Sequence, residues 1–255
     1  MKTKILLTLL TVFLAASIVN AEPPGRRGSH SHRKWSNGFI GVSVGGGMPM
    51  SDYGKSDTIE GSGYAKIGIH FNGTIGYKVM PFLGVMAMAG GTLNGFNADA
   101  YGKQFLDTAS IKTSWSSKSY LIGNYLAGAF VYFSDGQSYD IMVRILAGLA
   151  TVKFPIITSE SSSSGWTQEK NIEVPSARGL GYDVGVGINY KLAGKIGLLV
   201  NVDYLGTVVK YADRTESTEV KFVNGIVANS TYLDTKKYAQ PVGLINFTVG
   251  VAINL

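Results

Sequence analysis

The sequence predicts an all-β protein, an eight-stranded antiparallel up-and-down transmembrane β-barrel. Three observations predict it: long segments in which apolar and polar side chains alternate, connections that alternate between short turns and long polar loops, and a glycine-rich composition with few charges. Of 255 residues, 33 are glycine, 16% are charged and none is cysteine. Alternation gives a strand one apolar and one polar face, and a wall that is apolar outside and polar inside is typical of a membrane barrel.

The clearest alternation lies in residues 64–79. Every odd-numbered residue from Ala65 to Val79 is apolar or glycine, whereas the even-numbered ones include Lys66, His70 and Asn72. The segment is longer than the roughly 5–6-residue strand usual in soluble domains. We therefore predict a barrel strand with its odd-numbered face outward and its even-numbered face inward.

Seven other segments complete the predicted barrel. They span residues 39–47, 82–93, 115–133, 139–151, 178–192, 198–207 and 245–255. In the segment 115–133, two apolar sets compete for the outward face. One set is Leu121, Tyr125 and Val131, and the other is Ile122, Leu126 and Phe130. The sequence leaves the facing of this strand open.

The connections predict how the strands are ordered. Three are short, at Met80-Pro81, 134–138 and 193–195, and four are long and polar. Proline removes a donor from a strand ladder, so Pro81 marks a turn. Short and long connections alternate, as they must when consecutive strands run up and down. Both ends of the chain are then expected on the short-turn side, in the periplasm.

Aromatic residues fall into two bands along the predicted strands. The band near the short turns contains Tyr77, Phe82, Tyr132, Phe133, Tyr139 and Tyr190. The band near the long loops contains Tyr64, Trp115, Tyr120, Tyr204, Tyr211 and Tyr238. Amphipathic rings concentrate at both membrane interfaces, so the bands indicate two girdles. The alternative is that tyrosine and phenylalanine are simply common in strands.

Residues 1–21 are predicted to be a secretory signal peptide. They combine Lys2 and Lys4 with an apolar run and a small-residue end at Ala21, which is the usual signal pattern. The run falls short of the roughly 20 residues needed for a membrane helix, so an uncleaved anchor is the weaker alternative.

Residues 22–37 are predicted to be a basic periplasmic tail that precedes the barrel, residues 38–255. The formal net charge of the whole chain is +6, and four cations against one acid lie in this tail. The barrel is therefore close to neutral, and no basic, aromatic surface of the kind that binds nucleic acid remains. Since no other segment is apolar enough for a spanning helix, a membrane would be crossed by strands.

The closing residues carry a family resemblance. The pattern Thr248-x-Gly250-x-x-Ile253-x-Leu255 resembles the C-terminal assembly signal of outer-membrane barrels. The region from Trp35 to the C-terminus resembles the outer-membrane protein β-barrel domain family, in particular the eight-stranded barrel of outer-membrane protein A without its periplasmic domain. The family usually ends in an aromatic residue, whereas this chain ends in leucine. The resemblance implies outer-membrane lipids, lipopolysaccharide and the barrel assembly machinery as partners.

The predicted interior contains charged and amide side chains at similar depth. The proposed network consists of Lys66, His70, Arg144, Asp183, Asn201 and Asp203. Eight strands leave an interior that side chains can fill, and buried charges are costly unless they are paired. We predict that Arg144 pairs with Asp183 or Asp203 in a polar plug. The alternative is a narrow gated channel for ions or small solutes.

Enzymatic and metal-dependent functions are disfavoured. A lipid A-modifying enzyme, which some eight-stranded barrels resemble, would need a histidine beside a serine at the lipid-facing surface. The histidines are His30 and His32 in the tail and His70, which is predicted to face inward. Two histidines without a third ligand do not make a convincing zinc site. We therefore expect no enzyme, no metal and no cofactor.

The long loops supply the remaining functional signal. Asn224-Gly225 between apolar runs is a strong hairpin signal, because both residues tolerate positive φ. A second hairpin is expected from 152–156 to 172–174 across the flexible tip 161–165. Protruding strands offer free edges that can recruit a partner strand, although such a hairpin can also be an ordinary exposed loop. We predict a structural or surface-recognition role, with a possible extracellular protein ligand at the loops.

Overall fold

The computed structural model describes residues 38–57, 62–80, 82–105, 111–134 and 138–255. The region Trp35–Leu255 forms one compact unit. The predicted signal peptide (1–21), the basic tail (22–37) with its two histidines, and Pro81 lie outside the described residues.

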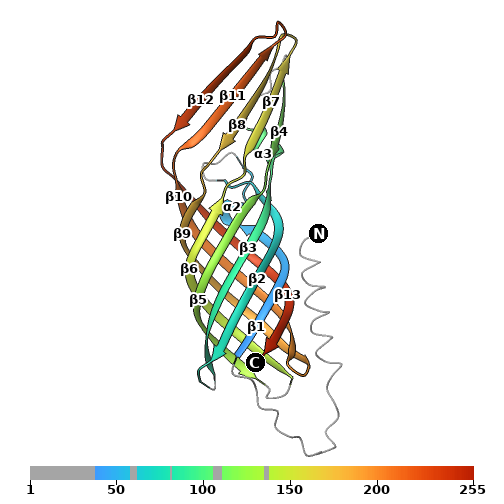
Figure 1. Ribbon diagram of the computed structural model, residues 1–255, viewed down its shortest axis with the longest axis vertical. Coiled ribbons are helices and arrows are strands. Elements are labelled where there is room, and N and C mark those ends of the chain that lie inside the picture. The colour runs from blue at the N-terminus through green and yellow to red at the C-terminus, as the bar shows by residue number, and fades with distance from the viewer. Residues whose placement is uncertain (1–37, 58–61, 81, 106–110, 135–137) are drawn as a thin grey trace, which may run out of the picture. The chain divides into compact units, whose positions relative to one another are not determined.

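Eight antiparallel strands close into a barrel, as predicted (Figure 1). They are β1 (Gly38–Met50), β2 (Ala65–Lys78), β3 (Leu83–Phe96), β5 (Tyr120–Ser134), β6 (Tyr139–Lys153), β9 (Ala177–Ala193), β10 (Ile196–Tyr211) and β13 (Tyr238–Asn254). Their order around the ring is β1-β13-β10-β9-β6-β5-β3-β2. Each strand thus pairs with its neighbours in the chain, and β1 pairs with β13 to close the ring. The N–H of Leu255 donates to the carbonyl of Gly38 (2.9 Å), so these two residues lie together at the short-turn end.

The long connections form a second sheet of five strands, which we call the loop sheet. Its strands are β4 (Lys112–Ser117), β7 (Ile157–Ser163), β8 (Trp166–Glu173), β11 (Arg214–Phe222) and β12 (Val227–Asp234), in the order β12-β11-β8-β7-β4. The two predicted hairpins are confirmed as β7–β8 and β11–β12. Strand β4 was predicted to be the start of a barrel strand, which is wrong: residues 118–119 separate it from β5. Two one-turn helices, α2 (Ser51–Gly54) and α3 (Ala98–Gly102), complete the connections.

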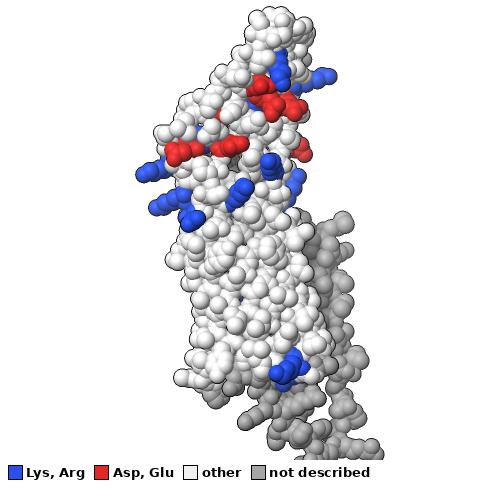
Figure 2. Space-filling model, in the orientation of Figure 1, with Lys and Arg blue, Asp and Glu red and all other residues white. Residues whose placement is uncertain are grey.

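The outer wall of the barrel is apolar and exposed. Figure 2 shows a broad band without charged residues over the barrel strands, with charges gathered beyond it over the loop sheet. Exposed apolar side chains of the barrel strands include Val42, Ile69, Ile75, Tyr125, Ile145, Leu180 and Val249. Apolar patches on soluble monomers rarely exceed a few hundred Å². Among the described residues, no helix is long and apolar enough to cross a membrane.

The facing of β5 is resolved by the structure. Ile122, Leu126 and Phe130 are buried inside the barrel, whereas Leu121 and Tyr125 are exposed on the outer wall. The two apolar sets competed in the sequence because this part of the interior is itself apolar. Side chains of β5 therefore still alternate between the inside and the outside of the barrel, but apolar residues no longer alternate with polar ones.

Lys66 does not face the interior, so the predicted placement of this residue is wrong. The register between β2 and β3 shifts between Ala65 and Gly68, which is a β-bulge. A bulge adds one residue to one strand and reverses the facing beyond it. Ala65 is consequently buried, and Lys66 is exposed.

Candidate functional site

The centre of the barrel is occupied by Arg144, which is 1% exposed. Its Nη2 donates to Asp203, its Nη1 donates to Asn201 Oδ1 (3.1 Å), and its Nε lies 3.5 Å from Asp183 Oδ1. Asn201 in turn donates to Thr248 Oγ1 (3.2 Å). The structure thus places Arg144 between both candidate carboxylates, which are themselves almost fully buried.

Glycines of β9 make room for this network. Arg144 lies on β6 and reaches past β9 to contact β10. A Cβ atom added at Gly185 would lie 1.8 Å from Asp203 Oδ1, and one at Gly187 would lie 2.4 Å from Asn201 Oδ1. Gly185 and Gly187 therefore leave the space that the Asp203 and Asn201 side chains occupy.

His70 belongs to a second buried chain of hydrogen bonds. Its Nδ1 lies 2.7 Å from Thr92 Oγ1, and its Nε2 lies 3.2 Å from Asn72 Nδ2. Ser43 donates to Asn72 Oδ1 (2.6 Å). Because the Asn72 amide can only donate to Nε2, the imidazole carries its proton on Nδ1 and donates to Thr92. His70 is thus engaged inside the wall, away from the outer face.

Apolar side chains flank the charge network on both sides. On β6, Arg144 lies between the buried Met142 and Leu146; on β10, Asn201 and Asp203 lie between Leu199 and Leu205. These residues are inward neighbours along the same strands, since side chains two positions apart share a face. On these two strands the charged residues are therefore bordered by apolar side chains, whereas the inward face of β2 is polar at His70, Asn72 and Thr74.

A further ion pair, which the sequence reasoning missed, lies near the short turns. Lys78 Nζ contacts Asp140 Oδ2 at 2.7 Å, and both side chains are largely buried. Lys78 Nζ also lies 4.2 Å from the centre of the Tyr132 ring. The sequence did indicate that both charged residues face inward, which was the one signal for this pair. Their pairing depends on side-chain reach from β2 to β6, which spacing along the chain does not reveal.

Aromatic side chains fill the long-loop end of the barrel, where the sequence predicted a second girdle. We call this cluster the aromatic roof, and it consists of Tyr53, Tyr64, Phe96, Tyr101, Phe105, Trp115, Tyr120, Phe154, Tyr211 and Tyr238. Tyr64 and Tyr120 are each only 4% exposed. The predicted long-loop girdle is therefore wrong for all its members except Tyr204, whose ring lies against the outward Tyr182.

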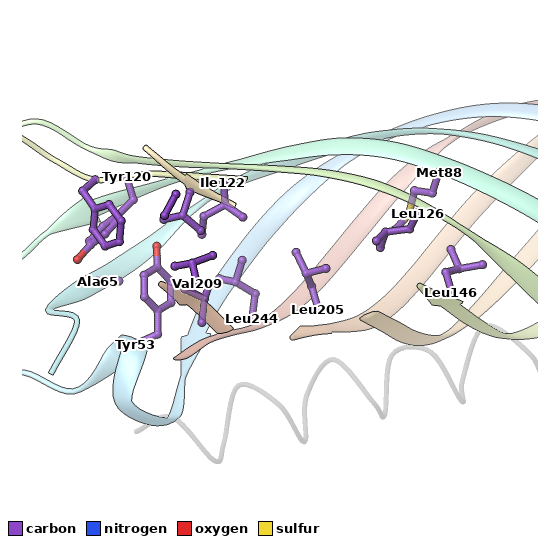
Figure 3. Packing of buried hydrophobic residues seen from close by; sticks show 14 of the residues in the cluster. Tyr53, Ala65, Met88, Tyr120, Ile122, Leu126, Leu146, Leu205, Val209 and Leu244 are labelled. Carbon is purple, nitrogen blue, oxygen red and sulfur yellow. The ribbon is translucent and has the colours of Figure 1, made fainter. Parts of the chain in front are cut away.

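The roof is held by hydrogen bonds as well as by ring contacts. Figure 3 shows Tyr53 and Tyr120 beside Ile122 and Val209, and the centres of the two tyrosine rings lie 5.2 Å apart. Tyr120 donates to the carbonyl of Gly63 (2.8 Å), and Tyr53 donates to Asn94 Oδ1 (3.3 Å). Burial raises the pKa of the Tyr53 hydroxyl, which keeps it protonated as a donor.

The predicted short-turn girdle is exposed in five of its six members. These are Tyr77, Phe82, Phe133, Tyr139 and Tyr190. The exception is Tyr132, whose hydroxyl donates to the Met80 carbonyl (3.1 Å).

The tip of the β11–β12 hairpin differs in detail from the predicted turn. The N–H of Gly225 donates to the Phe222 carbonyl (2.9 Å), and the N–H of Phe222 donates to the Ile226 carbonyl (2.9 Å). Of Asn224 and Gly225, only Gly225 has a positive φ (85°). This is a three-residue loop with glycine in the left-handed position. Asn224 contributes its side chain, which accepts from the Ile226 N–H (3.1 Å).

One face of the loop sheet is polar and carries a row of carboxylates. Glu160, Glu169 and Glu219 lie directly opposite one another on β7, β8 and β11. They line a groove of about 450 Å³ together with Lys112 and Lys221. Lys221 pairs with Glu219 at 2.6 Å. Within the described part of the chain, no group of three metal-binding side chains is placed to hold a metal ion.

The four residues of the predicted assembly signal lie on the last strand and just after it. Thr248 is buried inside the barrel, and Ile253 and Leu255 are exposed on the outer wall. Gly250 is tightly packed, since a Cβ there would lie 2.0 Å from the Val42 carbonyl oxygen. Their role in assembly stays a prediction.

Comparison with known proteins yields structural likenesses only. No family model matches the sequence, and no curated protein matches it. Neisserial surface protein A is 11% identical, with 88% of this chain and 100% of that chain covered and a TM-score of 0.42. The attachment invasion locus protein Ail of Yersinia pestis is 15% identical, with coverages of 85% and 99% and a TM-score of 0.37. The outer membrane protein OprG from Pseudomonas aeruginosa is 13% identical, with coverages of 88% and 99% and a TM-score of 0.38.

Ail and OprG are outer membrane proteins. The assignment of the fold itself stands on the strand pairing described above.

Proposed function

We propose that the protein is a non-enzymatic outer-membrane barrel that displays the loop sheet on the cell surface as a recognition element. The observation that carries this proposal is the loop sheet itself, five paired strands built entirely from the long connections. A barrel that only had to span the membrane would need no such sheet. Loops held on a rigid scaffold are a common place for binding surfaces.

The membrane location is supported by the exposed apolar wall and by the enclosed polar interior. A closed barrel satisfies its backbone groups within the wall, as a bilayer requires. Outer-membrane lipids and lipopolysaccharide would contact the wall, and the assembly machinery would insert it. Short turns and chain ends would then lie in the periplasm, with the loop sheet outside.

The orientation can be tested by thiol labelling on intact cells, since the chain has no cysteine. Ser164→Cys places a thiol at the exposed β7–β8 tip, and Lys195→Cys places one at an exposed short turn. A membrane-impermeant maleimide is expected to label the first variant on intact cells, and the second only after the outer membrane is permeabilised. The reverse pattern would refute the proposed orientation.

The buried side chains at its centre lead us to expect that the barrel does not conduct. Residues 22–255, refolded and inserted into planar bilayers, are expected to give no single-channel steps above the lipid background, because Arg144, Asn201 and Asp203 are almost fully buried inside the barrel. Steady conductance would replace the recognition role with the narrow channel as the leading function. The labelling experiment tests the orientation of the protein in the membrane, and the conductance experiment tests whether its interior is open.

A further inference from the structure

Strand β12 is an unusually unprotected sheet edge. It ends the order of the loop sheet and pairs with β11 in an unbroken register over eight residues, and Figure 1 shows it at the open side of that sheet. Natural edges are commonly blunted by lysine, proline, bulges or short length. Residues 227–233 contain no charge and no proline, whereas the opposite edge, β4, has six residues and begins with Lys112.

The one charged residue of β12, Asp234, is hydrogen-bonded at the end of the strand that lies toward the barrel. Asp234 accepts from the backbone N–H of Lys236 (2.9 Å) and from the Tyr238 hydroxyl (2.8 Å). The hydrogen bond from Lys236 is the main reason that the pKa of this carboxyl lies below its usual range. Asp234 therefore closes the end of the strand and leaves the edge before it uncharged.

The hydrogen-bond pattern identifies which backbone groups are available at this edge. Phe222 and Ile226 form a hydrogen-bonded pair, and such pairs alternate with non-hydrogen-bonded pairs along an antiparallel ladder. Even-numbered residues of β12 consequently direct their N–H and C=O groups to β11. Odd-numbered residues direct theirs to the free edge, and these are Val227, Asn229, Thr231 and Leu233.

This edge is complementary to itself in one antiparallel register. With Ser230 opposite Ser230 of a second copy, the free-edge residues pair as Val227 with Leu233 and Asn229 with Thr231. Apolar side chains thus meet apolar ones, and polar side chains meet polar ones. The hydrogen-bonding positions of the two strands also coincide, which a shift by one residue would destroy. Val227, Asn229, Thr231 and Leu233 are all exposed and can be reached.

The direction of the strand then decides where the second copy must be. The chain leaves the barrel along β10 and β11 and returns toward it along β12. An antiparallel partner strand must run away from this barrel and toward its own. Two copies in one membrane present β12 strands that both run toward that membrane, so they cannot pair in this way.

We propose that β12 pairs antiparallel with β12 of a second copy held in an opposing membrane, so that two loop sheets join into one sheet between two cells. This inference rests on the proposed function, because it requires the loop sheet to lie outside the cell. One edge contact is small compared with a stable interface. Many copies on each surface can bind together through multivalency.

Charge variants of β12 test whether the partner is a second copy. Vesicles carrying wild-type protein are expected to cluster with one another. Asn229→Lys/Thr231→Lys places like charges opposite each other across the contact, so clustering within this population should fall at least about tenfold. Clustering within the Asn229→Glu/Thr231→Glu population should fall by a similar factor. Mixing the two populations should restore clustering between them, measured with vesicles of two colours.

A single cysteine tests the register without changing any charge. Ser230 would face its own copy in a non-hydrogen-bonded pair, where Cα atoms lie about 4.5 Å apart, within the range of a disulfide. Ser230→Cys is expected to give a covalent dimer when clustered vesicles are treated with diamide, which takes up the two hydrogens that the thiols lose. Asn229→Cys is the matched control, since it would face Thr231 and should give little dimer.

Several outcomes would overturn the inference. They are the absence of wild-type clustering, failure of the mixed charge variants to cluster, and dimers that form equally with Asn229→Cys or without vesicle contact. If Ser164→Cys is still labelled on intact cells in such a case, the display of the loop sheet on the cell surface stands and only the second copy is refuted as partner. If Ser164→Cys is not labelled, the proposed function itself fails, even when the vesicles cluster.

Discussion

Replacing Arg144 by alanine is expected to lower the free energy of unfolding of the barrel by about 3–5 kcal/mol. The guanidinium contacts Asp203 and Asn201 and lies 3.5 Å from Asp183. Its removal leaves two buried carboxylates without a counter-charge in an enclosed interior. The measurement is the urea unfolding midpoint of the protein folded in lipid vesicles, followed by tryptophan fluorescence.

Two matched variants show whether the loss comes from unpaired charge. Arg178→Ala removes an exposed arginine of β9 and is expected to change the stability by less than about 0.5 kcal/mol. The triple variant Arg144→Met/Asp183→Asn/Asp203→Asn removes all three charges. It should recover much of the lost stability, because the cost arises when a buried charge has no counter-charge. A triple variant as unstable as Arg144→Ala would show that packing, and not charge, dominates.

The barrel could be predicted because the outer wall obeys one strict rule. Every outward side chain in the wall must be apolar, so the alternation in β2 and β9 is visible over many residues. Inward positions obey a weaker rule, since they can be glycine, paired polar groups or apolar side chains. In β5 the interior is apolar at Ile122, Leu126 and Phe130, and the sequence alone could not choose a face.

Single-residue events also lie beyond a periodic reading. The bulge between Ala65 and Gly68 reverses two positions and moves Lys66 out of the predicted network. Similarly, the short break at residues 118–119 separates β4 from β5 within what reads as one strand. The break at residues 118–119 contains neither glycine nor proline, the residues that usually signal an interruption. The bulge ends at Gly68, which is one of three glycines in β2 and is therefore not distinctive.

The interior charges could be placed in depth but not in detail. Counting positions from the short turns brought Arg144, Asp183 and Asp203 to one level, which is where the structure places them. Which carboxylate is hydrogen-bonded depends on the space above Gly185 and Gly187. Most of the long-loop aromatics lie at the predicted end of the barrel but not on its outer wall, and Tyr204 is the exception. Those rings lie where strands leave the barrel, and the side facing the roof is set by loop packing.

Tyr120 is the central ring of the aromatic roof, which makes it the most informative position for testing the roof. Its ring contacts Tyr53, Phe96 and Phe154 at centroid distances of 5.2, 6.1 and 5.9 Å. Its hydroxyl donates to the Gly63 carbonyl (2.8 Å). The residue thus joins the chain before β2, the end of β3 and the chain after β6.

Tyr120→Ala is expected to destabilise the barrel by about 3–5 kcal/mol, the usual cost of truncating a buried aromatic side chain. Tyr120→Phe keeps the ring contacts and loses only the hydrogen bond to Gly63, so its cost should be about 1 kcal/mol. Tyr125→Ala, on the outer wall of the same strand, controls for the loss of an exposed ring. The same urea midpoint measures all three. If the roof were only a set of loose loop contacts, Tyr120→Ala and Tyr120→Phe would unfold at similar urea concentrations. A large difference between them would show that the rings, rather than the hydroxyl, hold the loop end of the barrel closed.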